Sequence, residues 1–222
     1  MIKAIIFDFD GTIIDTESAW YAAFREAYQN YGVDLTLEMY SQCIGTSLHA
    51  FNPYEYLKTD LHLPIDLEAF RHAVQARHAA LVDAEEMRAG IFDYLQEARH
   101  HGLKIGLASS SGEEWVEHFL GKLQIRRYFD CLRTAGNVQH VKPDPELYLQ
   151  ALRCLGVAAS EAVAIEDSPH GTAAAKAAGV YCLTVPNAIT KRLPFERPGH
   201  FAESLADVDF NDLLAQCVGA LP

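Results

Sequence analysis

Two aspartates, Asp8 and Asp10, stand one residue apart directly after an apolar run at the start of the chain. The run Ile5-Ile6-Phe7 is β-branched and aromatic, which predicts a strand buried on both faces of a parallel sheet. The aspartates then lie at the carboxyl end of that strand, where open α/β sheets bind their ligands. Because two unpaired carboxylates are costly to bury side by side, we expect a cation between them.

Polar residues also follow the later elements of the chain. They are Ser109, Ser110 and Ser111 after the predicted strand 104–108, Lys142 before Pro143, and Glu166 and Asp167 after the predicted strand 162–165. The carboxyl ends of parallel strands share one edge of a sheet, so these residues are expected to meet in a single crevice.

The combined residue types suit phosphoryl transfer. Oxygen-only ligation by Asp8, the Asp10 carbonyl and Asp167, with Glu166 nearby, favours Mg²⁺, and Ser109, Ser110 and Lys142 would bind a phosphate. Asp8 is the expected nucleophile, which would form an aspartyl-phosphate. If Gly11 allows the chain to turn, Asp10 would protonate the leaving oxygen and then activate water. The sequence therefore predicts a two-step phosphatase.

Each polar segment taken alone also fits a structural role. Ser111 and Glu114 have the spacing of a helix capping box, and both roles of the serine run are compatible. Lys142 alone reads as an exposed lysine before a helix. The pair after strand 162–165 alone reads as a strand-end turn.

The elements that position these residues alternate along most of the chain. Residues 17–88 show helical periodicity and almost no strand signal, and strands and helices alternate afterwards. The predicted elements are helix 91–101, strand 104–108, helix 113–123, strand 131–134, helix 146–155, strand 162–165, helix 172–178, strand 180–185, loop 186–198 and helix 210–218. This pattern predicts an α/β fold with a Rossmann-like, doubly wound parallel sheet and a helical insert. The expected domains are a core of residues 1–15 and 89–222 and an insert of residues 16–88.

The amino-acid composition excludes several classes of partner and site. The formal net charge of −12 argues against a nucleic-acid partner. The five cysteines are odd in number and lack Cys-x-x-Cys spacing, so we expect neither a disulfide framework nor a thiolate zinc site, and we expect reduced thiols in the cytoplasm. No segment approaches the roughly 20 apolar residues of a membrane helix, so the protein is expected to be neither secreted nor anchored.

The motifs Asp8-Phe9-Asp10-Gly11-Thr12, Ser109, Lys142-Pro143 and Glu166-Asp167-Ser168 together resemble the four motifs of the haloacid dehalogenase superfamily. The insert and the run 166–171 resemble its β-phosphoglucomutase and phosphoglycolate phosphatase branch, which carries a small helical cap. The resemblance implies Asp8 as nucleophile, Asp10 as acid and base, Ser109 and Lys142 as phosphate ligands, and Asp167 as metal ligand with Glu166 nearby. It also implies Mg²⁺.

In this resemblance the cap determines specificity. Thr16 is similar to the hinge position, and Trp20 and the run Gly45-Thr46-Ser47 to the specificity positions. The helical spacing of Trp20, Phe24 and Tyr28 indicates side chains that pack in the interior of the cap rather than side chains that bind substrate. A mutase of this branch would carry a histidine in the first cap helix and an arginine after the glycine loop, where this chain has Trp20 and Leu48.

We therefore expect hydrolysis of a small-molecule phosphate ester by a monomer. The alternatives are a sugar phosphomutase of the β-phosphoglucomutase type, a phospho-accepting module similar to a response-regulator receiver, and a dehalogenase, which would not need Mg²⁺.

Overall fold

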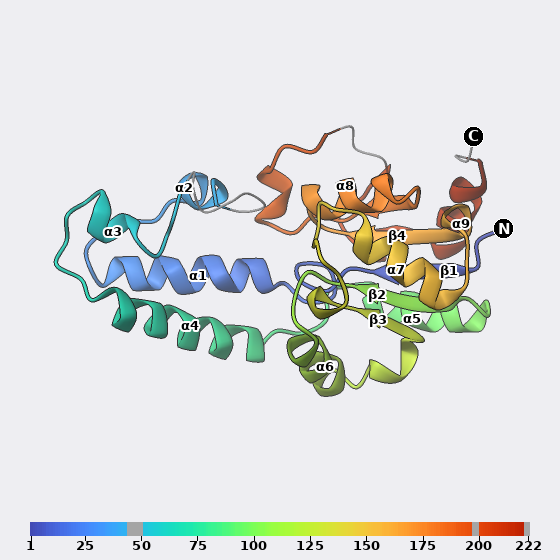
Figure 1. Ribbon diagram of the computed structural model, residues 1–222, viewed down its shortest axis with the longest axis horizontal. Coiled ribbons are helices and arrows are strands. Elements are labelled where there is room, and N and C mark those ends of the chain that lie inside the picture. Colours follow the sequence, from blue (N-terminus) through green and yellow to red (C-terminus); the bar gives the residue numbers. More distant parts are fainter. Residues whose placement is uncertain (44–50, 197–199, 220–222) are drawn as a thin grey trace. The chain divides into compact units, whose positions relative to one another are not determined.

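The computed structural model describes residues 1–43, 51–196 and 200–219 (Figure 1). The chain forms two compact units. The first, here the core unit, comprises Met1–Ile14, Glu86–Pro186 and Pro194–Pro222, and the second, here the helical unit, comprises Asp15–Glu85 and Asn187–Leu193. The sequence-based division placed 187–193 with the core. Ile189 packs into the apolar cluster of the helical unit, which accounts for the difference.

The core unit is built on a six-stranded sheet in the order β3-β2-β1-β4-β5-β6. The strands are β1 (Ala4–Phe7), β2 (Lys104–Ala108), β3 (Cys131–Arg133), β4 (Ala162–Glu166), β5 (Tyr181–Thr184) and β6 (His200–Phe201), and each neighbouring pair is parallel. In β1, Ile5 lies between Ile105 of β2 and Val163 of β4. The α/β, Rossmann-like fold is confirmed. The short edge strand β6 was not predicted.

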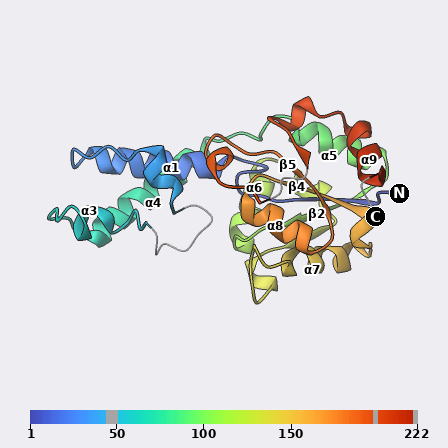
Figure 2. The same cartoon turned by 90° about the horizontal axis from the view of Figure 1, so that it is seen from above.

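Helices cover both faces of this sheet. They are α5 (Ile91–His100), α6 (Glu113–Lys122), α7 (Glu146–Leu155), α8 (Pro169–Ala177) and α9 (Phe210–Gly219). Figure 2 shows α5 and α9 on one face and α7 and α8 on the other. Helix α8 begins three residues before the predicted start at Thr172, because the Ser168 side chain accepts a hydrogen bond from the Gly171 N–H and Pro169 suits the first turn.

The helical unit contains α1 (Thr16–Gln29), α2 (Leu37–Ser41), α3 (Tyr56–Thr59) and α4 (Leu67–Asp83). The Asp15 and Asp66 side chains cap α1 and α4. The interior combines aliphatic and aromatic side chains, with Phe24 and Tyr28 buried and Trp20 packed at its margin. Two of the three residues predicted to pack in the interior of the cap are thus core residues.

The cysteines depart from the prediction. Cys131 of β3 and Cys154 of α7 form a disulfide with their Cα atoms 6.2 Å apart, so the expectation that no cysteines pair is wrong. They are separated by 23 residues and meet only because α7 packs against β3, a contact that sequence spacing does not reveal. The other thiols, Cys43, Cys182 and Cys217, are free.

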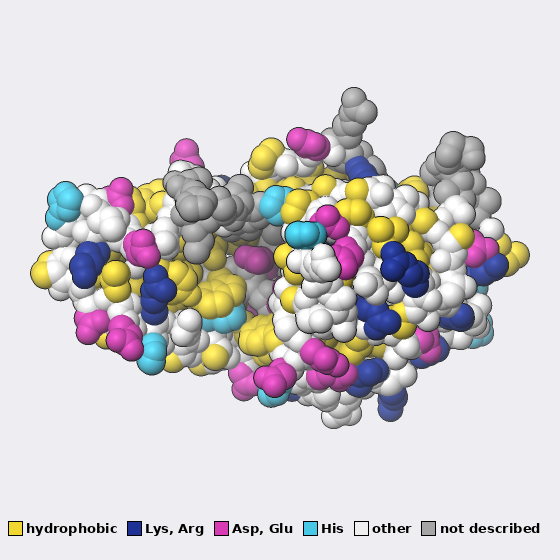
Figure 3. Space-filling view, viewed as in Figure 1, with side chains coloured by type: hydrophobic (Ala, Val, Ile, Leu, Met, Phe, Trp, Pro, Cys, Tyr) yellow, Lys and Arg dark blue, Asp and Glu magenta, His cyan; other side chains and the backbone are white. Residues whose placement is uncertain are grey.

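No helix within the described ranges has both the length and the apolar character that a membrane crossing requires. On the face drawn in Figure 3, acidic and basic side chains are interspersed with apolar ones over each unit.

Candidate active site

Four charged side chains meet at the carboxyl ends of β1 and β4, the neighbouring central strands. Lys142 Nζ donates to Asp8 Oδ1 at 2.5 Å and to Glu166 Oε1 at 2.6 Å, and Asp167 follows Glu166 in the chain. The side chains of Lys142, Asp8 and Glu166 are only 6%, 8% and 0% exposed. The structure therefore brings together predicted residues that lie 134 positions apart in sequence.

The buried ion network keeps Lys142 charged. Burial by itself lowers the pKa of Lys142, but the nearby carboxylates of Asp8 and Glu166 outweigh it, so the pKa lies above its ordinary value. Burial raises the pKa of Glu166, against the opposing effect of the Lys142 ammonium. A fixed positive charge is thus held directly beside Asp8.

Hydrogen bonds and close packing fix the position of the Glu166 side chain. The Tyr148 hydroxyl donates to Glu166 Oε1 at 2.6 Å, in addition to the bond from Lys142. The carboxylate lies against the first turn of α8, where a Cβ added to Gly171 would stand 1.9 Å from Glu166 Oε2. Because this glycine makes room for the carboxylate, it belongs to the site even though it carries no chemistry.

Asp10 turns toward the β2–α6 connection. Its carboxylate accepts hydrogen bonds from the Ser111 hydroxyl at 2.6 Å, the Trp115 indole N–H at 3.0 Å and the Ser109 hydroxyl at 3.4 Å. Ser109 is buried and Ser110 is exposed. The predicted capping box of Ser111 and Glu114 is wrong: Gly112 occupies the N-cap of α6, and the Ser111 hydroxyl donates to Asp10 instead.

The turn after Asp10 has the conformation that Gly11 was expected to allow. Gly11 has φ of +83°, and its N–H donates to the Ile14 carbonyl at 2.8 Å. The Arg88 guanidinium donates to the carbonyls of Gly11, Val185 and Pro186 and so ties this turn to the end of β5. Sequence reasoning gave Arg88 no role.

The site contains a donor set that fits a hard cation. Carboxylate oxygens of Asp8, Glu166 and Asp167 all lie within 4.8 Å of one another, and all three residues are buried. Three carboxylates against one ammonium leave a negative excess, and oxygen donors suit Mg²⁺. The Asp10 side chain lies outside this group, so its predicted part in metal binding rests on its backbone carbonyl.

The predicted cap residues lie within the helical unit or outside the described residues. Thr16 is buried at the first turn of α1. The Trp20 ring stacks on His78 of α4 with centroids 3.5 Å apart. Gly45, Thr46 and Ser47 lie outside the described residues. The specificity roles of these positions stay predictions.

Sequence reasoning also missed Trp115 and Tyr148, the partners of Asp10 and Glu166. Trp115 is separated from Asp10 by 105 residues and Tyr148 from Glu166 by 18, and neither lies in a motif. The one signal in the sequence was the serine run, whose third member, Ser111, was predicted as a helix cap but donates to Asp10.

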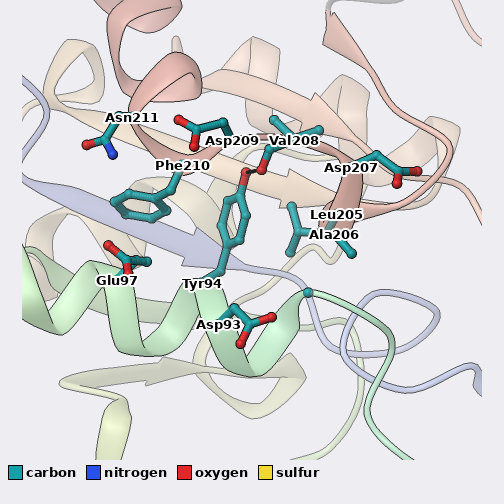
Figure 4. A pocket seen from close by; sticks show the side chains of 11 residues that line it. Asp93, Tyr94, Glu97, Leu205, Ala206, Asp207, Val208, Asp209, Phe210 and Asn211 are labelled. Atoms are coloured by element: carbon teal, nitrogen blue, oxygen red, sulfur yellow. Dashed lines mark hydrogen bonds between the residues drawn. The ribbon is translucent and has the colours of Figure 1, made fainter.

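A separate cavity of about 490 Å³ lies beside α5 and the segment that leads into α9 (Figure 4). Tyr94 and Phe210 line it together with the carboxylates of Asp93, Glu97, Asp207 and Asp209, and no lysine or arginine does. These carboxylates would repel a phosphate ester, so the cavity is a poor site for a substrate of that class.

The chain is similar in sequence and structure to several known proteins. The chain is 42% identical over 214 residues to YhcW of Bacillus subtilis (strain 168), a candidate phosphatase by its name, covering 96% of this chain and 97% of that protein. It is 30% identical over 180 residues to a phosphatase of Thermotoga maritima named for phosphorylated carbohydrates, covering 81% and 82%. The crystal structure of CbbY from Rhodobacter sphaeroides in complex with phosphate matches with a TM-score of 0.70 and 31% identity, covering 93% of this chain and 96% of that one.

The family model of the haloacid dehalogenase-like hydrolases matches residues 5–185, which include every charged residue of the sheet-edge site. The chain belongs to the haloacid dehalogenase-like hydrolase family.

Proposed function

We propose that this protein is a Mg²⁺-dependent phosphatase that hydrolyses small phosphorylated metabolites through an aspartyl-phosphate on Asp8. The observation that carries the proposal is the Lys142 ammonium, buried and bonded to both Asp8 and Glu166 beside Asp167. A nucleophilic carboxylate is paired there with a fixed cation and a further oxygen donor set.

In the first step, an Asp8 carboxylate oxygen attacks phosphorus and the bond to the leaving oxygen breaks. Asp10 donates a proton to that oxygen, held in orientation by Ser111 and Trp115. Lys142 balances charge on Asp8 and on the phosphoryl oxygens, and the Ser109 hydroxyl is available to the phosphate. A Mg²⁺ ion held by Asp8, Asp167 and the neighbouring oxygens would supply the remaining charge neutralisation.

In the second step, Asp10, now a carboxylate, accepts a proton from water as the water attacks the phosphorus of the aspartyl-phosphate. The phosphorus–oxygen bond to Asp8 breaks, and inorganic phosphate leaves. The two aspartates thus have different tasks, which agrees with their different hydrogen-bond partners in the fold.

Phosphorylated sugars are the substrate class that we place first. Support comes from the Thermotoga maritima relative, whose name specifies phosphorylated carbohydrates. A sugar phosphate also offers hydroxyl groups beyond the reacting phosphate, which a separate specificity unit could bind.

A phosphate-release screen over common phosphorylated metabolites, with Mg²⁺ and with EDTA, tests the proposal. We expect release that requires Mg²⁺, at least a 1000-fold loss of kcat in Asp8→Asn, and an acid-stable phosphoprotein that accumulates in Asp10→Asn but not in Asp8→Asn. Asp93→Asn makes the same change at an exposed carboxylate outside the site and should keep full activity. Equal residual activity in the two site variants would contradict the roles, and an isomerised sugar phosphate without free phosphate would identify a mutase.

A further inference from the structure

The disulfide between Cys131 and Cys154 has one buried and one exposed half. Cys131 is 4% exposed and packs in the apolar cluster between the sheet and α7, with Leu152 and Leu155 among its members. Cys154 is an exposed residue in the last turn of the same helix. The two sulfur atoms therefore differ in the access that they offer to a reagent from solvent.

This difference matters because thiol–disulfide exchange needs an approach along the sulfur–sulfur axis, from the side opposite the leaving sulfur. Attack on Cys154 is aligned when the reagent comes from solvent and Cys131 lies behind, in the protein. Attack on Cys131 would require the reagent to pass through the packed cluster.

We propose that Cys154 is a thiolation site, at which a small thiol such as a cysteine-containing peptide opens the disulfide. The incoming thiolate sulfur bonds to Cys154 Sγ, the Cys131–Cys154 bond breaks, and its electron pair leaves on Cys131 Sγ, which takes a proton from water. The products are a mixed disulfide on Cys154 and a buried thiol at Cys131. The thiol is the only co-reactant, and the number of disulfide bonds does not change.

The remaining thiols are poor competitors for this reaction. Cys182 and Cys217 are buried, and Cys43 is partly buried. Burial raises the pKa of each of these three thiols to about 12, so they carry little thiolate at neutral pH. Labelling by small thiols or their disulfides should consequently map to one residue.

Opening the bond affects more than the two cysteines. The cross-link closes a loop from Cys131 to Cys154, which contains Lys142 near its middle and Tyr148 in the first turns of α7. Releasing it frees the three-residue edge strand β3, which pairs with β2 on one side only. The opened protein is expected to lose roughly 5–10 °C in Tm, because a closed loop of this length restricts the unfolded chain.

The test uses the full chain purified without reductant. Alkylation in denaturant followed by mass measurement should find three reactive thiols before reduction and five after it. Glutathione at increasing concentration, followed by acid quench and peptide mapping, should give an adduct of one glutathione on Cys154, together with the loss in Tm. Five reactive thiols before reduction, an adduct on Cys131, or no adduct at 10 mM glutathione would each overturn the proposal.

Two matched variants test whether solvent access to each cysteine determines its reaction with glutathione. Cys131→Ser leaves Cys154 as a lone exposed thiol, which should take one glutathione from glutathione disulfide. Cys154→Ser leaves Cys131 buried, and it should take at least tenfold less under the same conditions. Equal labelling of the two variants, with circular dichroism confirming that both are folded, would overturn the assignment. Because none of these readouts is enzymatic, the outcome is independent of the proposed phosphatase activity.

Discussion

The two units of this protein differ in whether they bury charged side chains. The core unit buries Asp8, Glu166 and Asp167 together with the Lys142 side chain, and within the described part of the chain it holds all of the buried carboxylates. The helical unit buries aromatic rings, and its ion pairs lie outside: Arg77–Glu26, Arg71–Glu55 and Arg25–Asp34 have side chains between 42% and 65% exposed.

This difference shows that the core unit, and not the helical unit, contains an arrangement that lowers the free energy of unfolding. A buried ion network has lost its hydration, and replacing such a network with apolar side chains often stabilises a protein. Aromatic packing has no such cost. The core unit therefore keeps an arrangement that stability alone does not favour, at the edge of the sheet where substrate chemistry is proposed.

The largest expected effect comes from removing the buried cation. Lys142→Met leaves Asp8, Glu166 and Asp167 without their ammonium, so we expect kcat/KM to fall at least 100-fold, about 3 kcal/mol of transition-state stabilisation. Lys3→Met is the matched control, since Lys3 also pairs with a carboxylate at 2.5 Å, that of Glu161, but is 58% exposed. Phosphate-release kinetics and urea unfolding of both variants check this. Similar losses in the two variants would break the contrast between buried and exposed ions.

The next effect concerns the space that the ion network needs. Gly171→Ala places a Cβ 1.9 Å from Glu166 Oε2, so we expect about 3 kcal/mol or more of destabilisation together with loss of activity. Gly121→Ala in α6, where nothing lies within 4 Å of an added Cβ, should instead stabilise the helix by about 0.5–1 kcal/mol. Urea unfolding measures both, and a neutral Gly171→Ala would show that Glu166 is free to move.

A third effect comes from His78, a buried imidazole of the helical unit. Burial lowers the pKa of His78 to about 4, against a smaller opposing effect of its hydrogen bond to the Thr16 backbone. The unfolded chain therefore binds more protons between pH 6.5 and pH 4, so the stabilisation is complete above pH 6.5 and is lost as the pH falls toward 4.

His78→Phe should keep the stacking on Trp20 and remove this titration. We expect the wild type to lose roughly 2 kcal/mol more than the variant between pH 7 and pH 4.5, as measured by urea unfolding. Parallel pH profiles for the two proteins would count against a neutral, buried His78.

The smallest effect is expected at the exposed ion pairs. Arg77 donates twice to Glu26, at 2.6 and 2.9 Å, yet both side chains are nearly half exposed. Arg77→Gln should leave the unfolding midpoint unchanged within error in 1 M NaCl, because salt screens exposed charges. A clear loss of stability at high salt would show that this exposed pair stabilises the protein as a buried ion pair would.

Local sequence signals determined much of the core unit. Strand 104–108 and helix 146–155 were predicted with the bounds that the structure shows. An apolar run or a Pro-initiated helix is encoded by neighbouring residues, so its bounds can be read directly. The placement of polar residues at strand ends also predicted the meeting of Asp8, Lys142 and Glu166. Parallel strands bring their carboxyl ends to one edge of the sheet, even when they are far apart in the chain.

Only the tertiary structure decided which side chains surround those acids. Trp115 and Ser111 hold Asp10, Tyr148 holds Glu166, and Cys131 pairs with Cys154. Each of these contacts depends on how a helix is rotated and packed against the sheet, which is determined by the sum of many weak apolar contacts and leaves no fixed spacing in the chain. The sequence by itself thus determined the sheet and the acids at its edge, while packing decided the partners that orient them.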